Sequence, residues 1–450
     1  MGYALHVKTI RMANGSRRAM LCERSTGVPL ANPTLYITTC VYLAGREYNT
    51  QVSILSAIHF LYIWADKNGV DLEKTFKAGT FLNLQQVEGL VRDARMNLRQ
   101  YVNDPLEMTF GGGALSSQPR YRRHRPRRKA QSAMFNKDNT TIIRLSYVRA
   151  YLEWLANTAI SMVSAKKPEY EAIIEARQGM LNAIGERVPG KGVSRLRRGF
   201  TKEERAKFLE VIDPKSPQNP FKSEFVRARN HIVGHMLFHL GCRRGELLLI
   251  KEKDIDWNPG NEGGPTVGLR DHPLDPEDTR RVRPQFKTRE RRLPLSRTLA
   301  RLVKKYIQRY RDRIPGARSH GYLLVGREGK PLSLSSVDDI FRSWSLLEGL
   351  PDDLSTHTPR YDWNEMFSEK ADRMIAEGQW TVEDEKLIRR YHQGWVDDSL
   401  MPSLYARRHI ERKAKITSLE LQRDYLDDDF IVGPDNARKL LEGKEDNELK

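Results

Sequence analysis

Apolar residues recur at helical spacing through much of the first 185 residues. The pattern predicts helices over residues 49–76, 83–101, 140–163 and 170–184. In the first of these, Asn68-Gly69 is expected to stop the helix. In the third, Leu145, Val148 and Leu152 face a core, which places Arg144 and Arg149 on the outer face. We therefore expect residues 1–185 to form an all-helical domain.

The second half of the chain has a mixed pattern. Thr201 and Glu204 have the spacing of a capping box, so a new helix should begin there. Further helices are predicted over residues 226–252, 298–311 and 334–347, followed by irregular helical structure. Strand-like pieces over 265–295 include a hairpin at 282–295, with Leu293 and Leu295 facing inward. The expected fold class is mostly α with a small antiparallel sheet.

Glycine, proline and arginine mark the boundaries. Pro189-Gly-Lys-Gly192 and Arg195–Arg198 predict a connector at residues 186–198. The expected domains are a helical domain (1–185) with a basic insertion near 111–135, and a mixed α/β domain (199–415). The tail, 416–450, either packs on a neighbouring subunit or is loose.

The charge of the chain points to a polyanion. Lys and Arg number 76 against 58 Asp and Glu, a net charge of +18, which favours nucleic acid as partner. Residues 120–129 hold seven cations in ten positions, and Pro126 excludes a packed helix there. This segment is a solvated linker, a basic arm along a phosphate backbone, or both. The candidate DNA-binding residues are Arg120, Arg122, Arg123, Arg125, Arg127, Arg128, Lys129, Arg144 and Arg149.

Metal, disulfide and membrane chemistry are not indicated. The chain has three cysteines without CxxC spacing, and Cys242 lacks an identifiable activator, so a reducing cytoplasm fits. His231, His235 and His239 lie four apart, but no HExxH motif or nearby acidic pair completes a metal site. We expect no metal, no cofactor, no secretory signal and no membrane span.

Two pairs of residues carry the strongest chemical signal. Arg243 and Glu246 are three apart on a predicted helix, so the carboxylate can orient a guanidinium that is aimed at a phosphate. Arg244 lacks this partner and is the second choice; a surface ion pair is the alternative interpretation. His357 and Arg360 repeat the spacing, with Pro359 in the first turn of a helix, and both side chains can donate to one phosphate.

Three further residues would complete a phosphate-cleaving site. Lys287, at a hairpin tip, can protonate a leaving oxygen, although it could be an ordinary exposed lysine. Trp395 offers an N–H that cannot titrate, with core packing as the alternative. Tyr405 supplies a hydroxyl nucleophile among cations, and only its position singles it out among 17 tyrosines.

Together these segments resemble the tyrosine recombinase (phage integrase) family. Gly241-Cys-Arg-Arg-Gly-Glu-Leu247 is similar to the family's T-G-x-R-x-x-E-L box, and His357-Thr-Pro-Arg360 to its H-x-x-R box. Phe286-Lys-Thr-Arg-Glu-Arg-Arg-Leu-Pro-Leu295 resembles the strand-tip lysine segment, and Gly394-Trp395 stands where members carry Gly-His or Gly-Trp. Tyr405 follows Trp395 by ten residues, where nine is more usual, and Tyr361-Asp362-Trp363 departs from the common continuation of the second box.

The resemblance implies a mechanism. A site-specific recombinase or integrase would cleave double-stranded DNA through a 3′-phosphotyrosyl bond to Tyr405, without metal or ATP. Arg243, His357, Arg360 and Trp395 would hold the developing charge, Lys287 would protonate the leaving 5′-oxygen, and Glu246 would support the site. The resemblance also implies a C-shaped DNA clamp, a monomer when free and a homotetramer on paired sites, with room for accessory proteins.

Two other functions remain open at this point. A type IB topoisomerase or telomere resolvase uses a similar site on different substrates. A non-catalytic DNA-binding relative would have lost part of the residue set. We expect a cytoplasmic, nucleoid-associated protein encoded by a bacterium, an archaeon or a phage, for which the sequence leaves the target site, the direction of recombination and the role of the tail open.

Overall fold

The computed structural model describes residues 5–12, 15–98, 101, 138–162, 169–190, 198–258, 264–396, 414, 417 and 418. The chain divides into two compact units. Unit 1 comprises Met1–Arg195 and Leu274–Pro276, and unit 2 comprises Leu196–Pro273 and Glu277–Lys450.

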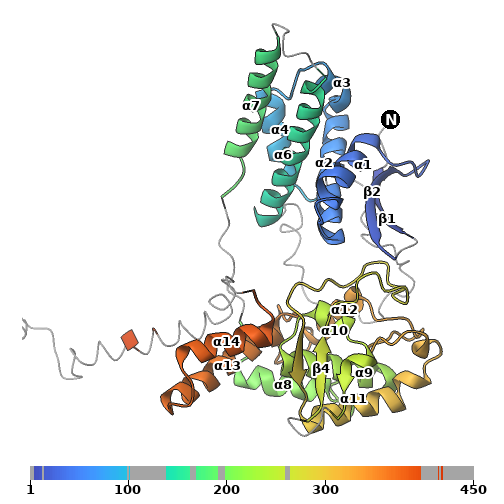
Figure 1. Cartoon of the computed structure of the whole chain (residues 1–450), viewed down its shortest axis with the longest axis vertical. Helices are drawn as coiled ribbons and strands as arrows, with labels where there is room; N and C mark the ends of the chain where they lie inside the picture. Colours follow the sequence, from blue (N-terminus) through green and yellow to red (C-terminus); the bar gives the residue numbers. More distant parts are fainter. Residues whose placement is uncertain are drawn as a thin grey trace, which may run out of the picture. The chain divides into compact units, whose positions relative to one another are not determined.

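Unit 1 is mostly helical but begins with a hairpin of two strands (Figure 1). Its elements are β1 (Leu5–Arg11), β2 (Arg17–Glu23), α1 (Ala31–Tyr36), the π-helix η1 (Ile37–Tyr42), α2 (Tyr48–Lys67), α3 (Leu72–Lys77), α4 (Leu84–Ala94), α6 (Asp138–Ile160) and α7 (Tyr170–Glu186). The prediction of an all-helical unit is wrong at β1 and β2, which pair antiparallel from Leu5↔Glu23 to Arg11↔Arg17. Leu5, Ala19 and Leu21 are buried on one face of this hairpin, which is a two-residue period and not a helical one.

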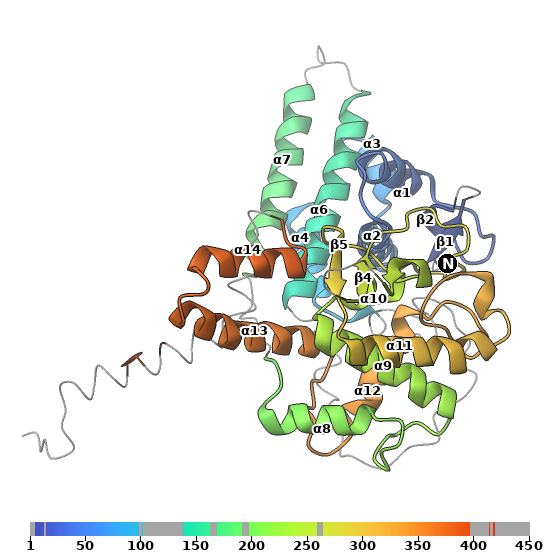
Figure 2. The same ribbon diagram turned by 60° about the horizontal axis from the view of Figure 1, so that its bottom comes forward.

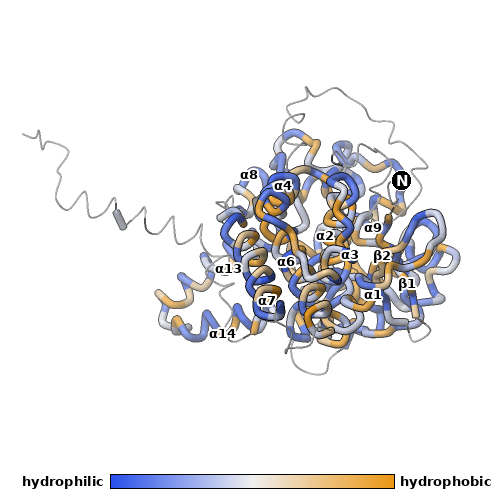
Figure 3. The backbone as a smooth tube through the Cα atoms, turned by 90° about the horizontal axis from the view of Figure 1, so that it is seen from above, coloured by the Kyte–Doolittle hydropathy of each residue, from blue (hydrophilic) through white to orange (hydrophobic). Residues whose placement is uncertain are grey.

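The helices of unit 1 follow the apolar pattern closely. The first helix ends at Lys67, and Gly69 takes a left-handed φ of 64° directly after it. A separate short helix, α3, then covers the rest of the predicted span. Asn83 caps α4 in a full capping box with Gln86, but α4 is shorter than predicted. Hydrophobic and hydrophilic residues interleave along α6 and α7 (Figure 3).

The expected outer position of Arg144 and Arg149 is wrong. Arg144 is half-buried, donates to the carbonyl oxygens of Ala94 and Met96, and lies over the ring of Phe60. Arg149 donates from Nε to the carbonyl oxygen of Leu181 at 3.1 Å. Both guanidinium groups therefore bind backbone inside unit 1, where the long aliphatic stems fit a half-buried helix face; their assignment to DNA binding stays a prediction.

Unit 2 packs helices around a small sheet. Its elements are α8 (Lys202–Ile212), α9 (Glu224–Leu240), α10 (Arg244–Leu249), η2 (Glu252–Asp254), β3 (Ile255–Asp256), β4 (Thr266–Leu269), β5 (Arg291–Pro294), α11 (Arg297–Arg309), η3 (Arg311–Arg313), η4 (Ala317–Ser319), α12 (Leu334–Trp344), α13 (Thr358–Ala376) and α14 (Val382–Gln393). Thr201 caps α8 in a capping box with Glu204, as predicted. The fold class, mostly α with small antiparallel sheets, is confirmed.

The sheet of unit 2 has the order β3-β4-β5 and is antiparallel throughout. The predicted hairpin within residues 282–295 is wrong, because β5 pairs with β4 in the register Val267↔Leu293 and Leu269↔Arg291. The inward direction of Leu293 and Leu295 is confirmed, since both are buried. A connection of residues 270–290, which includes Lys287, therefore joins β4 to β5.

The irregular structure expected after residue 347 is instead mainly a pair of regular helices. The helices α13 and α14 lie side by side (Figure 2). Pro359 stands in the first turn of α13, as predicted, and Thr381 caps α14 in a capping box with Asp384. Arg389 of α14 is buried and donates to Ser368 Oγ of α13 at 2.7 Å. Among the described helices, none combines the length and the hydropathy that a membrane crossing requires.

Candidate active site

The first motif lies between α9 and α10. Gly241 ends α9 with a left-handed φ of 55°, and a Cβ there would stand 2.7 Å from Trp363 Cγ, so only glycine fits. The spacing of Arg243 and Glu246 predicted that both lie on one helix. In the structure, Arg243 is the extended N-cap residue that precedes α10. Glu246 accepts the backbone N–H of Arg243 at 2.9 Å, and its carboxylate lies 3.5 Å from Arg243 Nη1. The two residues are thus paired, through a helix cap.

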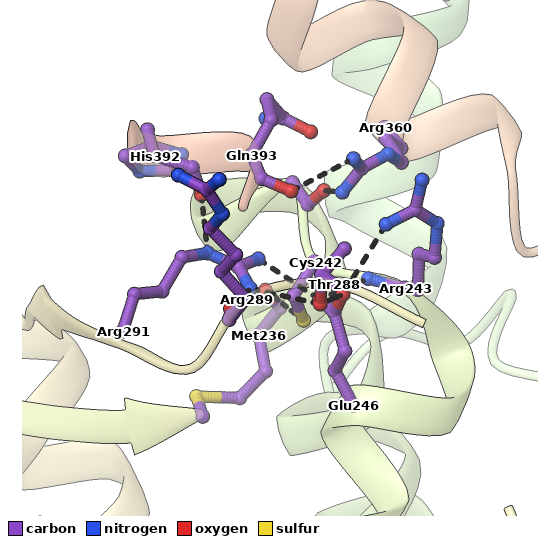
Figure 4. A network of polar contacts seen from close by, with 11 residues as sticks. Met236, Cys242, Arg243, Glu246, Thr288, Arg289, Arg291, Arg360, His392 and Gln393 are labelled. Carbon is purple, nitrogen blue, oxygen red and sulfur yellow. Dashed lines mark hydrogen bonds and ion pairs between the residues drawn. The ribbon is translucent and has the colours of Figure 1, made fainter. Parts of the chain in front are cut away.

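Glu246 is the centre of a buried polar network (Figure 4). Its Oε2 lies 3.0 Å from Arg291 Nη2, and both side chains are at most 1% exposed. Its Oε1 accepts from Thr288 Oγ1 at 2.6 Å. Arg243, whose side chain is 21% exposed, is therefore held by a carboxylate that is itself fixed on several sides.

Arg360 comes to the same place from α13. Its side chain is 1% exposed, and Nη1 donates to the carbonyl oxygen of Gly241 at 2.7 Å. Its Nη2 donates to the carbonyl oxygen of Gln393 at 3.3 Å, at the end of α14. The guanidinium carbon stands 5.8 Å from the ring centroid of Trp395. A charged group this deeply buried is rare unless it is paired or functional.

Trp395 follows directly on a glycine turn. Gly394 ends α14 with a φ of 65°, and a Cβ there would stand 2.7 Å from Arg291 Nη1 and 2.9 Å from the carbonyl oxygen of Arg289. The Trp395 ring is buried against Tyr361 and lies near Arg360. Trp395 therefore packs in a small core with Tyr361 and also lies close to the buried Arg360.

The other predicted site residues have fewer described contacts. Lys287 is exposed in the connection before β5, next to Thr288. His357 is half-buried at the N-cap of α13, one turn before Arg360. Arg244 forms an ion pair with Asp338 of α12, which leaves Arg243 as the arginine beside Glu246. Tyr405, and the basic arm from Arg120 to Lys129, lie outside the described residues.

The unusual continuation of the second box has a structural role. Asp362 is fully buried and accepts from Arg205 Nε and Nη2 at 3.0 and 2.8 Å and from the Phe200 N–H at 3.0 Å. Trp363 faces Gly241 and stacks on His392 with ring centroids 4.0 Å apart. These contacts connect the start of α13 to α8 and to the end of α14, and so support the site.

Burial and charge set the ionisation of the groups around Glu246. Burial alone would raise the pKa of Glu246, but the charges of Arg291 and Arg360 and the hydrogen bonds from Thr288 and the Arg243 N–H lower it overall. Burial, with the charge of Glu246, raises the pKa of Cys242 to about 12, so this thiol is not a nucleophile. Burial and the two arginines lower the pKa of His392 to about 3. The carboxylate is therefore ionised at neutral pH, beside a neutral thiol and a neutral imidazole.

Sequence reasoning missed Arg291 and Thr288. A signal for Arg291 was present, because Arg291, Leu293 and Leu295 share one face of a strand at a two-residue period, and the two leucines were expected to point inward. An arginine on that face must be buried and paired. Nothing in the sequence indicated that its partner would be Glu246, 45 positions earlier.

The described part of the site holds two converging arginines and an indole, a donor set suited to a phosphate oxyanion, and an ionised carboxylate that orients Arg243. Residues 219–392 match the model of the phage integrase family. No curated protein matches the chain. Over residues 219–392 the chain thus matches the family of the tyrosine recombinases, enzymes that break and rejoin DNA strands.

Solved structures similar to the chain are also recombinases by name. They include the XerH site-specific recombinase bound to a palindromic difH substrate, in a post-cleavage complex (16% identity, 62% of this chain, 78% of that chain, TM-score 0.38). The pre-cleavage XerH complex with difH has a TM-score of 0.36 at the same identity and coverage. The XerA recombinase matches at 10% identity over 85% of this chain and 96% of that chain, with a TM-score of 0.33.

Proposed function

We propose that this enzyme is a site-specific recombinase that uses Tyr405 as nucleophile and needs neither metal nor ATP. The phenolic oxygen attacks a DNA phosphorus, the phosphorus–O5′ bond breaks, and a 3′-phosphotyrosyl bond forms. Lys287 gives a proton to the leaving O5′, and the phenolic proton is released. Rejoining is the reverse reaction with a 5′-hydroxyl, so the bond energy is conserved in the covalent intermediate.

The observation that carries the proposal is the convergence of Arg243, Arg360 and Trp395. Arg360 is 1% exposed and held by two backbone carbonyls, and Arg243 is oriented by Glu246. Donors fixed before the reaction begins stabilise a developing charge without reorganisation. His357, the N-cap residue one turn before Arg360, would add a ring N–H.

The direct test is covalent trapping on a nicked suicide substrate, in which the strand released by cleavage diffuses away. The purified chain should form a DNA adduct that survives denaturation by detergent, at the same rate with and without EDTA. A rate that falls with EDTA and returns with a divalent cation would contradict the metal-independent mechanism. An equimolar pair of target sites then separates strand exchange from simple relaxation of supercoils, which is the topoisomerase alternative.

We propose double-stranded DNA with specific sites as the substrate and a homotetramer on two such sites as the active assembly. The net charge of +18 supports a polyanionic partner. Analytical ultracentrifugation of the chain with and without a duplex that contains its site should show a larger assembly only with DNA. An identical species in both samples would contradict this assembly.

We further propose that residues 120–129 form a basic arm on the DNA backbone. Replacing the arm's arginines and its lysine by glutamine should weaken DNA binding at all sequences alike. The slope of log K against log salt should become shallower by about 0.9 for each DNA phosphate that the arm no longer neutralises. An unchanged slope, measured by fluorescence anisotropy between low and high salt, would instead identify the segment as a solvated linker.

A further inference from the structure

We propose that Arg291 is a positioning residue for DNA cleavage, which holds the Arg243, Lys287 and Trp395 segments in one arrangement through its ion pair with Glu246. This inference rests on the proposed function and deepens it at the same site. Arg291 is the first residue of β5; it lies in the segment that resembles the strand-tip lysine segment, but the sequence assigned it no role.

The first set of contacts joins Arg291 to the Arg243 segment. Arg291 Nη2 lies 3.0 Å from Glu246 Oε2, and the same carboxylate oxygen accepts the Arg243 N–H at 2.9 Å. The other oxygen lies 3.5 Å from Arg243 Nη1. A change at Arg291 therefore reaches the Arg243 guanidinium through one intervening carboxylate.

The second set joins Arg291 to the Lys287 segment. Arg291 Nη1 donates to Thr288 Oγ1 at 3.2 Å and to the carbonyl oxygen of Arg289 at 3.3 Å. Thr288 Oγ1 also donates to Glu246 Oε1 at 2.6 Å. Lys287 is exposed, but the residue after it is thus held on two sides by buried charged groups.

The third set joins Arg291 to the turn that precedes Trp395. Arg291 Nε donates to the carbonyl oxygen of His392 at 2.6 Å, and the Arg289 N–H donates to the carbonyl oxygen of Gly394 at 2.9 Å. The space beside Gly394 is filled by the Arg291 guanidinium and the Arg289 carbonyl. All three segments therefore converge on one planar cation, visible in Figure 4.

Only arginine supplies donors in this geometry. Its rigid fork serves four acceptors at once, whereas a lysine has a single point of charge and a different reach. The separation between the reacting groups must be kept within a fraction of an ångström, since a misplacement of about 1 Å can reduce a rate about 100-fold. Arg291 touches neither the phosphate nor the nucleophile in this account, so its effect is on rate through position.

Arg291 also keeps Glu246 ionised. Burial favours the neutral carboxyl, and the charge of Arg291 is the largest opposing influence. The other groups around Glu246 are Arg243, Arg360, Thr288, Cys242 and His392, and the His392 imidazole, with a pKa of about 3, is neutral near neutral pH. The thiol, with a pKa of about 12, does not titrate near neutral pH. Loss of Arg291 should therefore raise the pKa of Glu246, so that titration of Glu246 adds its own pH dependence to cleavage.

The experiment compares Arg291→Met and Arg291→Lys with the wild-type chain on a nicked suicide substrate. Single-turnover cleavage should fall about 100-fold for Arg291→Met and less for Arg291→Lys, while DNA affinity by anisotropy stays unchanged. In Arg291→Met the remaining cleavage should also rise with pH as Glu246 loses its proton. Arg311→Lys is the matched control, because the Arg311 side chain is 1% exposed, as that of Arg291 is, and donates to the carbonyl oxygens of Tyr322 and Ala317, away from the motifs.

Thermal unfolding separates positioning from folding. If Arg291→Met does not fold, the folded Arg291→Lys variant decides. Wild-type cleavage rates in the folded Arg291 variants, or an equal loss in Arg311→Lys, would overturn the positioning role and leave the proposed function standing. If the wild-type chain itself forms no covalent adduct, the proposed function is wrong, and this role is wrong with it.

Discussion

Tyr405→Phe is expected to abolish the covalent adduct with a nicked suicide substrate while DNA binding persists. The substitution removes one oxygen and leaves the ring, so packing and charge change little, but no atom remains to form the bond to phosphorus. Adduct formation should fall below detection on a denaturing gel, and the dissociation constant by anisotropy should stay within about twofold of the wild-type value.

The matched control for this experiment is Tyr391→Phe. Tyr391 is 60% exposed on α14 and donates to the carbonyl oxygen of Arg292 at 3.1 Å. It is the nearest tyrosine before Tyr405 in the sequence, and its hydroxyl group has a structural partner. Trapping should be normal in this variant. Normal trapping by Tyr405→Phe, or its loss in Tyr391→Phe, would show that the nucleophile is not Tyr405.

Arg243→Ala should reduce the single-turnover cleavage rate by about 10²- to 10³-fold, the usual cost of losing one oriented donor to an oxyanion. The Arg243 side chain is 21% exposed, and Glu246 keeps its ion pair with Arg291. The buried carboxylate therefore retains a partner, and the midpoint of thermal unfolding should change little. The loss should appear in the rate and not in DNA affinity.

Arg244→Ala is the matched control, one position along the chain. Arg244 pairs with Asp338 of α12, a partly exposed ion pair that contributes little to stability. Its cleavage rate should stay within about threefold of wild type. If Arg244→Ala lost as much as Arg243→Ala, the choice between the two arginines would be reversed.

The sequence correctly predicted features that depend on a few neighbouring residues, such as the starts and ends of helices. The capping box at Thr201 and the helix end at Asn68-Gly69 depend on interactions between residues at most four positions apart. Both lie where the sequence predicted them. The fold class followed from periodicity. The short strand β1 was missed because the helical pattern after residue 48 dominated the interpretation of the N-terminal segment.

The arrangement around Glu246 could be predicted only in part. The pairing of Arg243 with Glu246 was expected from a spacing of three residues, but it is made through a helix cap and not along a helix face. The buried ion-pair partner of Glu246 is Arg291 on β5. The pairing of β5 with β4 joins residues far apart in the sequence, so local spacing does not predict it. Spacing within a segment is local information, whereas contacts between segments depend on how the helices and the sheet pack.

The predicted positions of two arginines on the outer face of a helix were wrong. The apolar pattern placed Arg144 and Arg149 on an outer face and their charge made them candidates for DNA binding, yet both donate to backbone carbonyls inside unit 1. An arginine can bury its aliphatic stem and satisfy its donors with carbonyl oxygens. A basic residue on an amphipathic helix therefore indicates a polyanion only where its side chain is solvent-exposed.

The most direct measurement of the central claim is the identity of the residue joined to DNA. The trapped adduct of the wild-type chain is digested with trypsin and nuclease, and the phosphonucleotide-modified peptide is fragmented in a mass spectrometer. The peptide of residues 391–407 contains two tyrosines, Tyr391 and Tyr405, and fragment ions distinguish them. The modification is expected on Tyr405, joined to a 3′-phosphate; a modification on any other residue, or a 5′-phosphate linkage, would show that Tyr405 is not the nucleophile of this mechanism.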